Sequence, residues 1–245
     1  MALGDVIMTE PVLRYFYKAG HLVNIITNYD FIFENSPYYI NHQTNIDFNL
    51  DGVYEQNRYK LTTDAYFEAC GIDYKQLSIA DRKPCLYIPE VEIGIEKHSY
   101  VLIHNTPCPT GKYRNVYTDY NKIFDYLKSR NINYILIEPN KYDFKFLCSL
   151  VRNAKLFIGL DSSPAHIAQV YDIPSIIFMG NVNPAYRYLG DKQTYMFNEC
   201  ENQHCYHSFN IHPPMNSCCD KEIDSMPKCT HILAELVIEN IKRII

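Results

Sequence analysis

Hydrophobic and polar positions along the second half of the chain follow a regular alternation of two patterns. Short apolar runs rich in β-branched and aromatic residues predict buried strands at 99–104, 134–137, 156–160 and 175–180. Apolar residues at helical spacing predict helices between these strands, at 119–130, 143–153 and 164–171. Apolar strands that alternate with helices predict an α/β fold with a parallel sheet covered on both faces.

The first half repeats the alternation in shorter pieces. Helices are predicted at 9–17 and 64–70, and strands at 22–27 and 48–50. Charge and proline mix in residues 81–97, which indicates a linker. We therefore expect a domain at 1–95 and a second at 96–245, which closes with an amphipathic helix at 232–245.

Composition narrows the class of protein. The 245 residues are 47% hydrophobic and 21% charged, which is typical of globular chains. The formal net charge of −5 and the lack of a long basic run argue against nucleic acid as a partner. No apolar run is long enough for a transmembrane segment, and no secretion signal is recognisable, so we expect a cytoplasmic protein.

The sharpest candidate for chemistry is the stretch 157–168. An apolar strand ends at Leu160, small polar residues turn the chain, and a helix begins near Pro164. Amide groups and the positive end of the helix dipole then face the edge of the sheet, as in phosphate-binding sites. Ser162 and Ser163 add hydroxyl donors. The alternative is that Asp161 or Ser162 only caps the helix.

Four stretches of the chain resemble motifs of glycosyltransferase family 9, the ADP-heptose:lipopolysaccharide heptosyltransferases and their relatives. The four stretches follow the family motifs in order and spacing. They are Leu3–Pro11, the loop around Lys112, Asp161–His166 and Ile173–Gly180. Two of the motifs depart from the family pattern. The Lys112 loop lacks the family's Trp and Pro, and Ser163 stands where the family has Gly.

The resemblance implies a GT-B architecture of two Rossmann-like, doubly wound domains, with the acceptor on the first and the nucleotide sugar on the second. The chain begins inside the family's Leu-Gly-Asp loop, so we expect a short first domain that lacks the usual first strand. Alternatively, the reading frame begins upstream or another segment fills that position.

The resemblance also implies an inverting glycosyltransferase without a catalytic metal. It would move a heptose-like sugar from a nucleotide diphosphate, ADP by preference, to a glycan or lipid-linked acceptor, in the cytoplasm or at the inner membrane face. Asp5 matches the family's general base, and Gly4 and Thr9 flank it on the acceptor side. The donor phosphates would contact residues on the second domain, namely Lys112, Asp161, Ser162, Ser163 and His166.

Three other functions stay open from the sequence. The chain is alternatively a non-catalytic GT-B remnant that binds nucleotide or acts as a structural partner. A phage enzyme that glycosylates DNA is another alternative, which the net negative charge disfavours. A cysteine-based interaction module is a third, but the cysteine cluster occupies only one segment.

Five of the nine cysteines crowd into the segment 198–231. In a reducing compartment such a cluster indicates a metal more often than disulfides. A closed tetrahedral site needs four ligands. We expect a structural zinc or iron ion held by four from the set Cys200, Cys205, Cys218, Cys219 and Cys229, with buried thiols or disulfides as the alternative.

Overall fold

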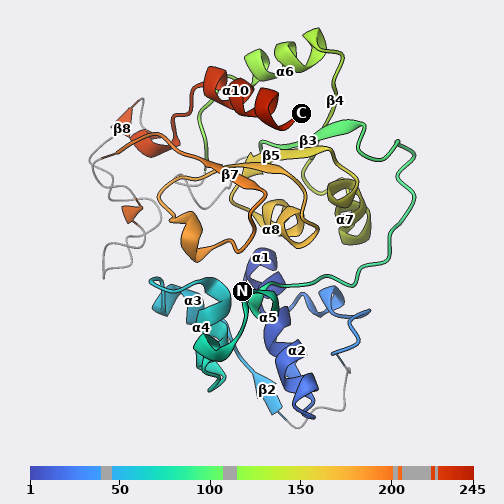
Figure 1. Cartoon of the computed structure of the whole chain (residues 1–245), viewed down its shortest axis with the longest axis vertical. Helices are drawn as coiled ribbons and strands as arrows, with labels where there is room; N and C mark the ends of the chain where they lie inside the picture. Colours follow the sequence, from blue (N-terminus) through green and yellow to red (C-terminus); the bar gives the residue numbers. More distant parts are fainter. Residues whose placement is uncertain (40–45, 107–114, 201–203, 206–221, 224–225) are drawn as a thin grey trace. The chain divides into compact units, whose positions relative to one another are not determined.

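The computed structural model describes residues 1–39, 46–106, 115–200, 204–205, 222–223 and 226–245 (Figure 1). The chain divides into two compact units. The first comprises Met1–Val91 together with Ala185–Gly190, and the second comprises Glu92–Pro184 together with Asp191–Ile245. The short segment 185–190 therefore packs in the first unit, although the residues on both sides of it belong to the second.

The second unit is built on a five-stranded parallel sheet. Its strands are β3 (Tyr100–His104), β4 (Asn133–Leu136), β5 (Leu156–Leu160), β6 (Ser175–Phe178) and β7 (Gln193–Met196). They lie in the order β4-β3-β5-β6-β7, and all four neighbouring pairs are parallel. The chain thus leaves β3 toward one edge of the sheet and leaves β5 toward the other edge.

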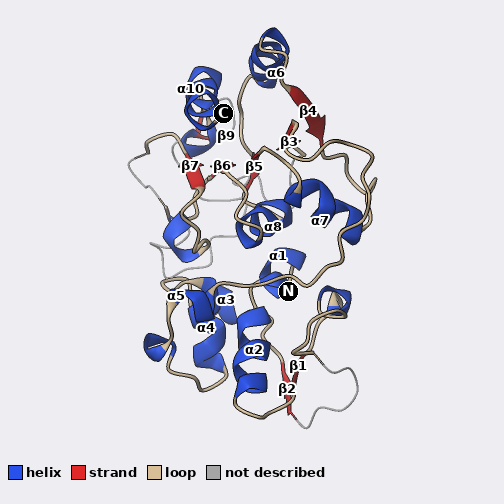
Figure 2. Cartoon of the chain, turned by 45° about the vertical axis from the view of Figure 1, so that its right-hand side comes forward, coloured by secondary structure: helices blue, strands red, loops and turns tan. Residues whose placement is uncertain are grey.

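Helices cover both faces of this sheet (Figure 2). The four helices are α6 (Tyr120–Ser129), α7 (Phe144–Arg152), α8 (Ser163–Val170) and α10 (Ala234–Ile244). Alternate strand residues such as Val101 and Ile158 pack with Leu127 of α6 and Val237 of α10 in one buried core. Helices α7 and α8 pack together on the opposite face. This arrangement confirms the expected α/β class.

Local sequence explains where the helices begin. The carboxylate of Asp143 accepts a hydrogen bond from the Phe146 amide at 2.7 Å, and Asp119 does the same for Lys122 at 3.4 Å. Each side chain satisfies an amide that the first helical turn leaves without a partner. The predicted helices therefore begin and end within one or two residues of the observed ones.

The first unit consists of short elements around two parallel strands. These elements are α1 (Leu3–Ile7), α2 (Glu10–Lys18), β1 (Val23–Ile25), η1 (Asp30–Ile32), β2 (Ile46–Phe48), α3 (Val53–Gln56), α4 (Thr62–Ala69), η2 (Tyr74–Gln76) and α5 (Ile79–Arg82). Strand β1 pairs with β2 in parallel, with Val23 opposite Ile46. The first element described is α1, where the sequence predicted a loop. The unit is short, as expected.

Several small elements had no counterpart in the predictions. These are α3, α5, β7, η4 (Pro184–Tyr186), β8 (Glu222–Ile223), β9 (Met226–Pro227) and η5 (Lys228–Thr230). Each has five residues or fewer, so a hydrophobic period cannot be read from it. Among the helices in the described ranges, none has the length and hydrophobicity needed to cross a membrane.

Candidate functional site

The turn between β5 and α8 places Ser162 at the carboxyl end of the sheet. Ser162 precedes the helix in an extended conformation, and its side chain does not cap the helix. Instead its hydroxyl donates to the Leu160 carbonyl at 3.0 Å and lies 3.0 Å from Nδ1 of His104, the last residue of β3. The contact bridges β3 and β5, the two strands at which the chain turns toward opposite edges. In open parallel sheets this is the position where ligands bind.

His104 is neutral at physiological pH in this position. Burial lowers its pKa from 6.5 to about 4, because the charged ring loses its hydration. Gly159 of β5 is the residue opposite His104, and a Cβ atom on it would lie 2.7 Å from Cζ of Phe157. It would also lie 2.9 Å from the His104 Cβ and 3.0 Å from its carbonyl oxygen, which is closer than ordinary contact. The glycine is therefore required for the close approach of β3 and β5.

Two main-chain amides at the start of α8, those of Ser162 and Ser163, are placed to donate hydrogen bonds to a ligand. The amides of Ala165 and His166 both donate to the Ser162 carbonyl, at 3.0 and 3.2 Å, and Pro164 has no N–H group. No described residue accepts a hydrogen bond from the amide of Ser162 or Ser163. The row of amides expected from the sequence is therefore reduced to these two, supported by the helix dipole.

Asp161 and His166 lie behind this turn. Both side chains are buried, and Nε2 of His166 is 4.0 Å from Oδ1 of Asp161. The Asp161 amide donates to the Phe178 carbonyl at 3.3 Å, which ties the end of β5 to the end of β6. Because both side chains are buried, they are better placed to stabilise the turn than to contact a ligand directly. Lys112, the remaining predicted donor-side residue, lies outside the described residues.

Asp5 in the first unit lies on α1, with Gly4 buried beside it. Oδ2 of Asp5 accepts a long hydrogen bond, 3.4 Å, from the Ala2 amide. Thr9 is also buried, and its hydroxyl donates to the Val6 carbonyl at 2.8 Å, so it stabilises the connection between α1 and α2. Of these three predicted residues, Asp5 has a side chain with part of its surface exposed.

Sequence reasoning missed the partner of Asp5. Nη1 of Arg187 lies 3.2 Å from Oδ1 of Asp5, and the arginine side chain is 4% exposed. Arg187 belongs to the segment 185–190, which packs in the first unit. No spacing or motif links two residues so far apart in the chain, so only the structure identifies this ion pair.

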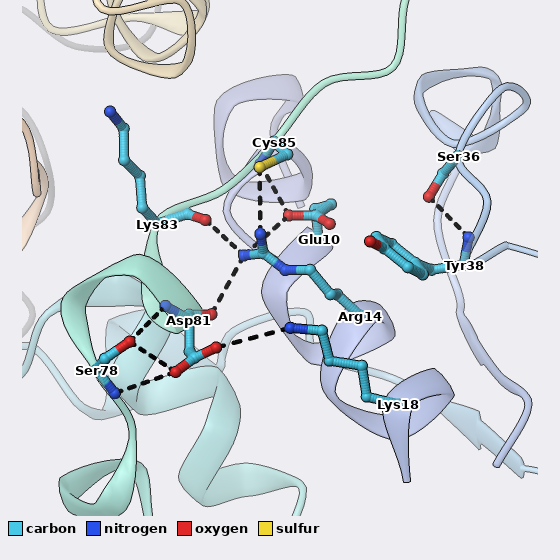
Figure 3. Close-up of polar contacts among 9 residues, drawn as sticks. All are labelled: Glu10, Arg14, Lys18, Ser36, Tyr38, Ser78, Asp81, Lys83 and Cys85. Atoms are coloured by element: carbon cyan, nitrogen blue, oxygen red, sulfur yellow. Dashed lines mark hydrogen bonds and ion pairs between the residues drawn. The ribbon is translucent and has the colours of Figure 1, made fainter. Parts of the chain in front are cut away.

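Another carboxylate of the first unit, the buried Glu10 at the start of α2, also has an arginine partner (Figure 3). Glu10 accepts a hydrogen bond from the Cys85 amide at 2.8 Å and lies 3.5 Å from Arg14. Burial dominates and raises the pKa of Glu10 from 4.5 to about 7. Arg14 also donates to the carbonyls of Asp81 and Lys83, at 3.2 and 2.6 Å, and contacts the Cys85 sulfur at 3.2 Å. The cluster fixes residues 81–85 against α2.

Arg14 and Lys18 also line a pocket of about 330 Å³, together with Leu77 and Asp81. Lys18 lies 3.8 Å from Asp81, which already accepts hydrogen bonds from Ser78 (Figure 3). The charges around this pocket are therefore satisfied within the protein.

The predicted metal ligands are only partly within the described residues. Cys218 and Cys219 lie outside them. Cys200 and Cys205 are half-buried, and Cys229 is buried. In the part of the chain that the structure describes, no group of three His, Cys, Asp or Glu side chains could hold a metal ion. Cys200, Cys205 and Cys229 therefore do not form a metal-binding group with one another.

Comparison with known families identifies one match. Residues 139–215 match the model of glycosyltransferase family 9 (heptosyltransferase). This confirms the resemblance seen in the motifs, over a segment that contains the β5–α8 turn. No curated protein shows significant sequence similarity to the chain.

Solved structures share the fold. The dodecameric iron-containing glycosyltransferase TibC from enterotoxigenic Escherichia coli aligns with a TM-score of 0.79 at 16% identity, over 100% of this chain and 74% of that one. Family 9 glycosyltransferase from Veillonella parvula aligns with a TM-score of 0.55 at 14% identity, over 100% and 94%. The E. coli ADP-heptose lipopolysaccharide heptosyltransferase II gives 0.54 at 11%, over 98% and 95%. The fold is therefore similar to that of GT-B heptosyltransferases.

Proposed function

We propose that this chain is an inverting glycosyltransferase that transfers a heptose-like sugar from an ADP-linked donor to a hydroxyl group of a glycan or glycolipid. One observation carries the proposal. The contact between Ser162 and His104 lies at the strand pair where parallel sheets bind ligands, beside two amides at a helix start. The family 9 match spans the same turn. A similar fold, TibC, has been solved in complex with ADP-D-β-D-heptose.

In this proposal the second unit binds the diphosphate. The amides of Ser162 and Ser163 would donate to its oxygens, and Lys112 would add a positive charge. These groups would stabilise the negative charge that develops on the leaving ADP. No metal ion takes part in the proposed step.

Asp5 would act as the general base. It accepts the proton of the acceptor hydroxyl while the hydroxyl oxygen forms a bond to the anomeric carbon. The bond between that carbon and the diphosphate oxygen breaks, and ADP leaves with the electron pair. Attack from the face opposite the leaving group inverts the anomeric configuration.

The test uses the purified full chain with ADP-heptose and a panel of glycan and glycolipid acceptors. We expect ADP to raise the thermal midpoint, and wild-type protein to release ADP and label an acceptor. Stabilisation by ADP without sugar transfer or hydrolysis would indicate the non-catalytic remnant. The absence of both would contradict the proposal.

We further propose a structural metal ion in the cysteine-rich segment, with ligands from Cys200, Cys205, Cys218, Cys219 and Cys229. The three described cysteines do not form a ligand group with one another, so Cys218 or Cys219 is part of the proposed site. Thiolate ligands suit zinc or iron, and a segment with little regular structure gains stability from such a site. Elemental analysis of protein purified without chelator should find about one metal ion per chain, and less than about half an equivalent would contradict the site.

A further inference from the structure

Residues 185–190 enter the first unit and are anchored there by α4. The Thr62 hydroxyl donates to the carbonyl of Tyr186 at 3.0 Å. Arg187 and Tyr188, which follow, are 4% and 5% exposed. Through these two buried residues the segment takes part in the packing of the first unit.

The Arg187 guanidinium has a separate contact to each of three elements. It lies 3.2 Å from Oδ1 of Asp5 on α1, donates to the Thr62 hydroxyl on α4 at 3.5 Å, and stacks over the ring of Tyr54 on α3 at 4.8 Å. A buried guanidinium requires such partners, because removal of its charge from water is costly. The stacked ring and the hydroxyl fix the plane of the guanidinium, and this plane sets where Asp5 can lie.

A second ion pair of the same unit, Arg82 with Asp64, differs from Arg187 with Asp5 in how many carboxylate oxygens the arginine contacts. Arg82 donates from Nη1 to both oxygens of Asp64, at 2.9 and 2.8 Å, so each oxygen of that carboxylate accepts a hydrogen bond from the arginine. In the pair of Arg187 and Asp5, the described contact runs from Nη1 to Oδ1 of the carboxylate. The other oxygen, Oδ2, has the long contact to the Ala2 amide and keeps capacity to accept a further hydrogen bond.

We infer that Arg187 is the positioning residue of the proposed base: it holds Oδ1 of Asp5 so that Oδ2 is directed to the acceptor hydroxyl. This inference rests on the proposed function. A general base acts only within hydrogen-bond reach of the proton that it removes, so small displacements of the carboxylate slow the reaction strongly. Arg187 acts through Asp5 and contacts no substrate in this scheme.

The experiment compares wild type with Arg187→Met, Arg187→Lys and the control Arg82→Met in transfer from ADP-heptose. We expect Arg187→Met to lower kcat on the order of 100-fold, while KM for ADP-heptose changes less than about twofold. Arg187→Lys keeps the charge but loses the planar fork, so its kcat should fall about tenfold. Arg82→Met breaks a comparable ion pair away from Asp5, and it should lower the thermal midpoint while kcat stays within about twofold.

The Asp5→Asn variant separates this inference from the proposed function. If wild type does not transfer sugar, or Asp5→Asn is as active as wild type, the proposed base fails. If activity depends on Asp5 but Arg187→Met and Arg82→Met have equal kcat, only the role of Arg187 is overturned. Adding Arg187→Met to Asp5→Asn should cause no further loss, since both act on one step.

If Arg187→Met does not fold, Arg187→Lys tests whether Arg187 positions Asp5. A folded Arg187→Lys with wild-type kcat overturns the inference. A folded Lys variant with reduced kcat and unchanged KM supports it.

Discussion

The two units of the chain present their polar groups by different means. In the second unit the candidate donors are main-chain amides of Ser162 and Ser163, set by strand register and by the start of α8. In the first unit two carboxylates, Asp5 and Glu10, are each held by an arginine side chain. A main-chain site survives most side-chain substitutions, whereas a site made of side chains is lost with one. Substitutions in the first unit should therefore have the larger effects.

The largest effect is expected for Asp5→Asn. The amide cannot accept the acceptor proton, so kcat should fall by about 10²–10⁴, with the affinity for ADP unchanged. Steady-state kinetics and calorimetric titration with ADP measure the two quantities. Asp64→Asn, which alters another paired carboxylate of the same unit, should leave kcat intact. A loss of ADP affinity in Asp5→Asn would break the division of roles between the units.

Glu10 should make stability depend on pH. Its pKa is about 7 in the folded chain against 4.5 unfolded, so the folded state binds the proton more tightly. This contribution to stability is complete below pH 4.5 and is lost as the pH rises to 7, by on the order of 3 kcal/mol. Urea unfolding at a series of pH values measures the slope.

Glu10→Gln should remove that slope, because the amide does not titrate. Glu68→Gln is the matched control, since Glu68 is a largely exposed carboxylate of the same unit, and it should leave the slope in place. Equal slopes in wild type and Glu10→Gln would show that the buried carboxylate is not the titrating group.

In the second unit Gly159→Ala should destabilise the fold by about 2 kcal/mol, because the new methyl group overlaps His104. It should also weaken ADP binding, since His104 contacts Ser162. Gly20→Ala is the control. It has open space but a left-handed backbone (φ +83°), so it should cost about 1 kcal/mol without a change in ADP binding. Unaltered ADP affinity in Gly159→Ala would remove this strand pair from the binding site.

The smallest effect is expected for Ser162→Ala. It removes one hydroxyl but keeps the two amides, so the Kd for ADP should rise about fivefold, equivalent to about 1 kcal/mol. Ser175→Ala removes a buried hydroxyl at the amino end of β6 and should leave the Kd unchanged. A loss of binding above about 100-fold in Ser162→Ala would mean that the hydroxyl, rather than the main chain, carries the site.

The sequence predicted the second unit better than the first for a physical reason. Strands such as β5 are continuous apolar runs, and helices such as α7 have a capping residue and apolar residues at helical spacing. Each can therefore be predicted from local residues. The β5–α8 turn follows from such local signals. It was predicted with its residues, although the hydrogen bonds of the Ala165 and His166 amides to the Ser162 carbonyl appear only in the structure.

The first unit depends on pairs that local patterns do not encode. Asp5 was found through a motif, but Arg187, Thr62 and Tyr54 reach it from other parts of the chain. Glu10 lies within the same motif stretch but was not predicted as a site residue, because its burial and its contact with the Cys85 amide come from tertiary packing. Such contacts become visible only when the elements are placed in space.

The return of residues 185–190 to the first unit has a consequence for any attempt to divide this protein. A fragment that stops at Val91 leaves Asp5 without its guanidinium, and the complementary fragment exposes Arg187 and Tyr188, which are buried in the whole chain. No single cut yields two self-sufficient pieces. On the ribosome, too, the first unit completes its packing only after most of the polypeptide has emerged.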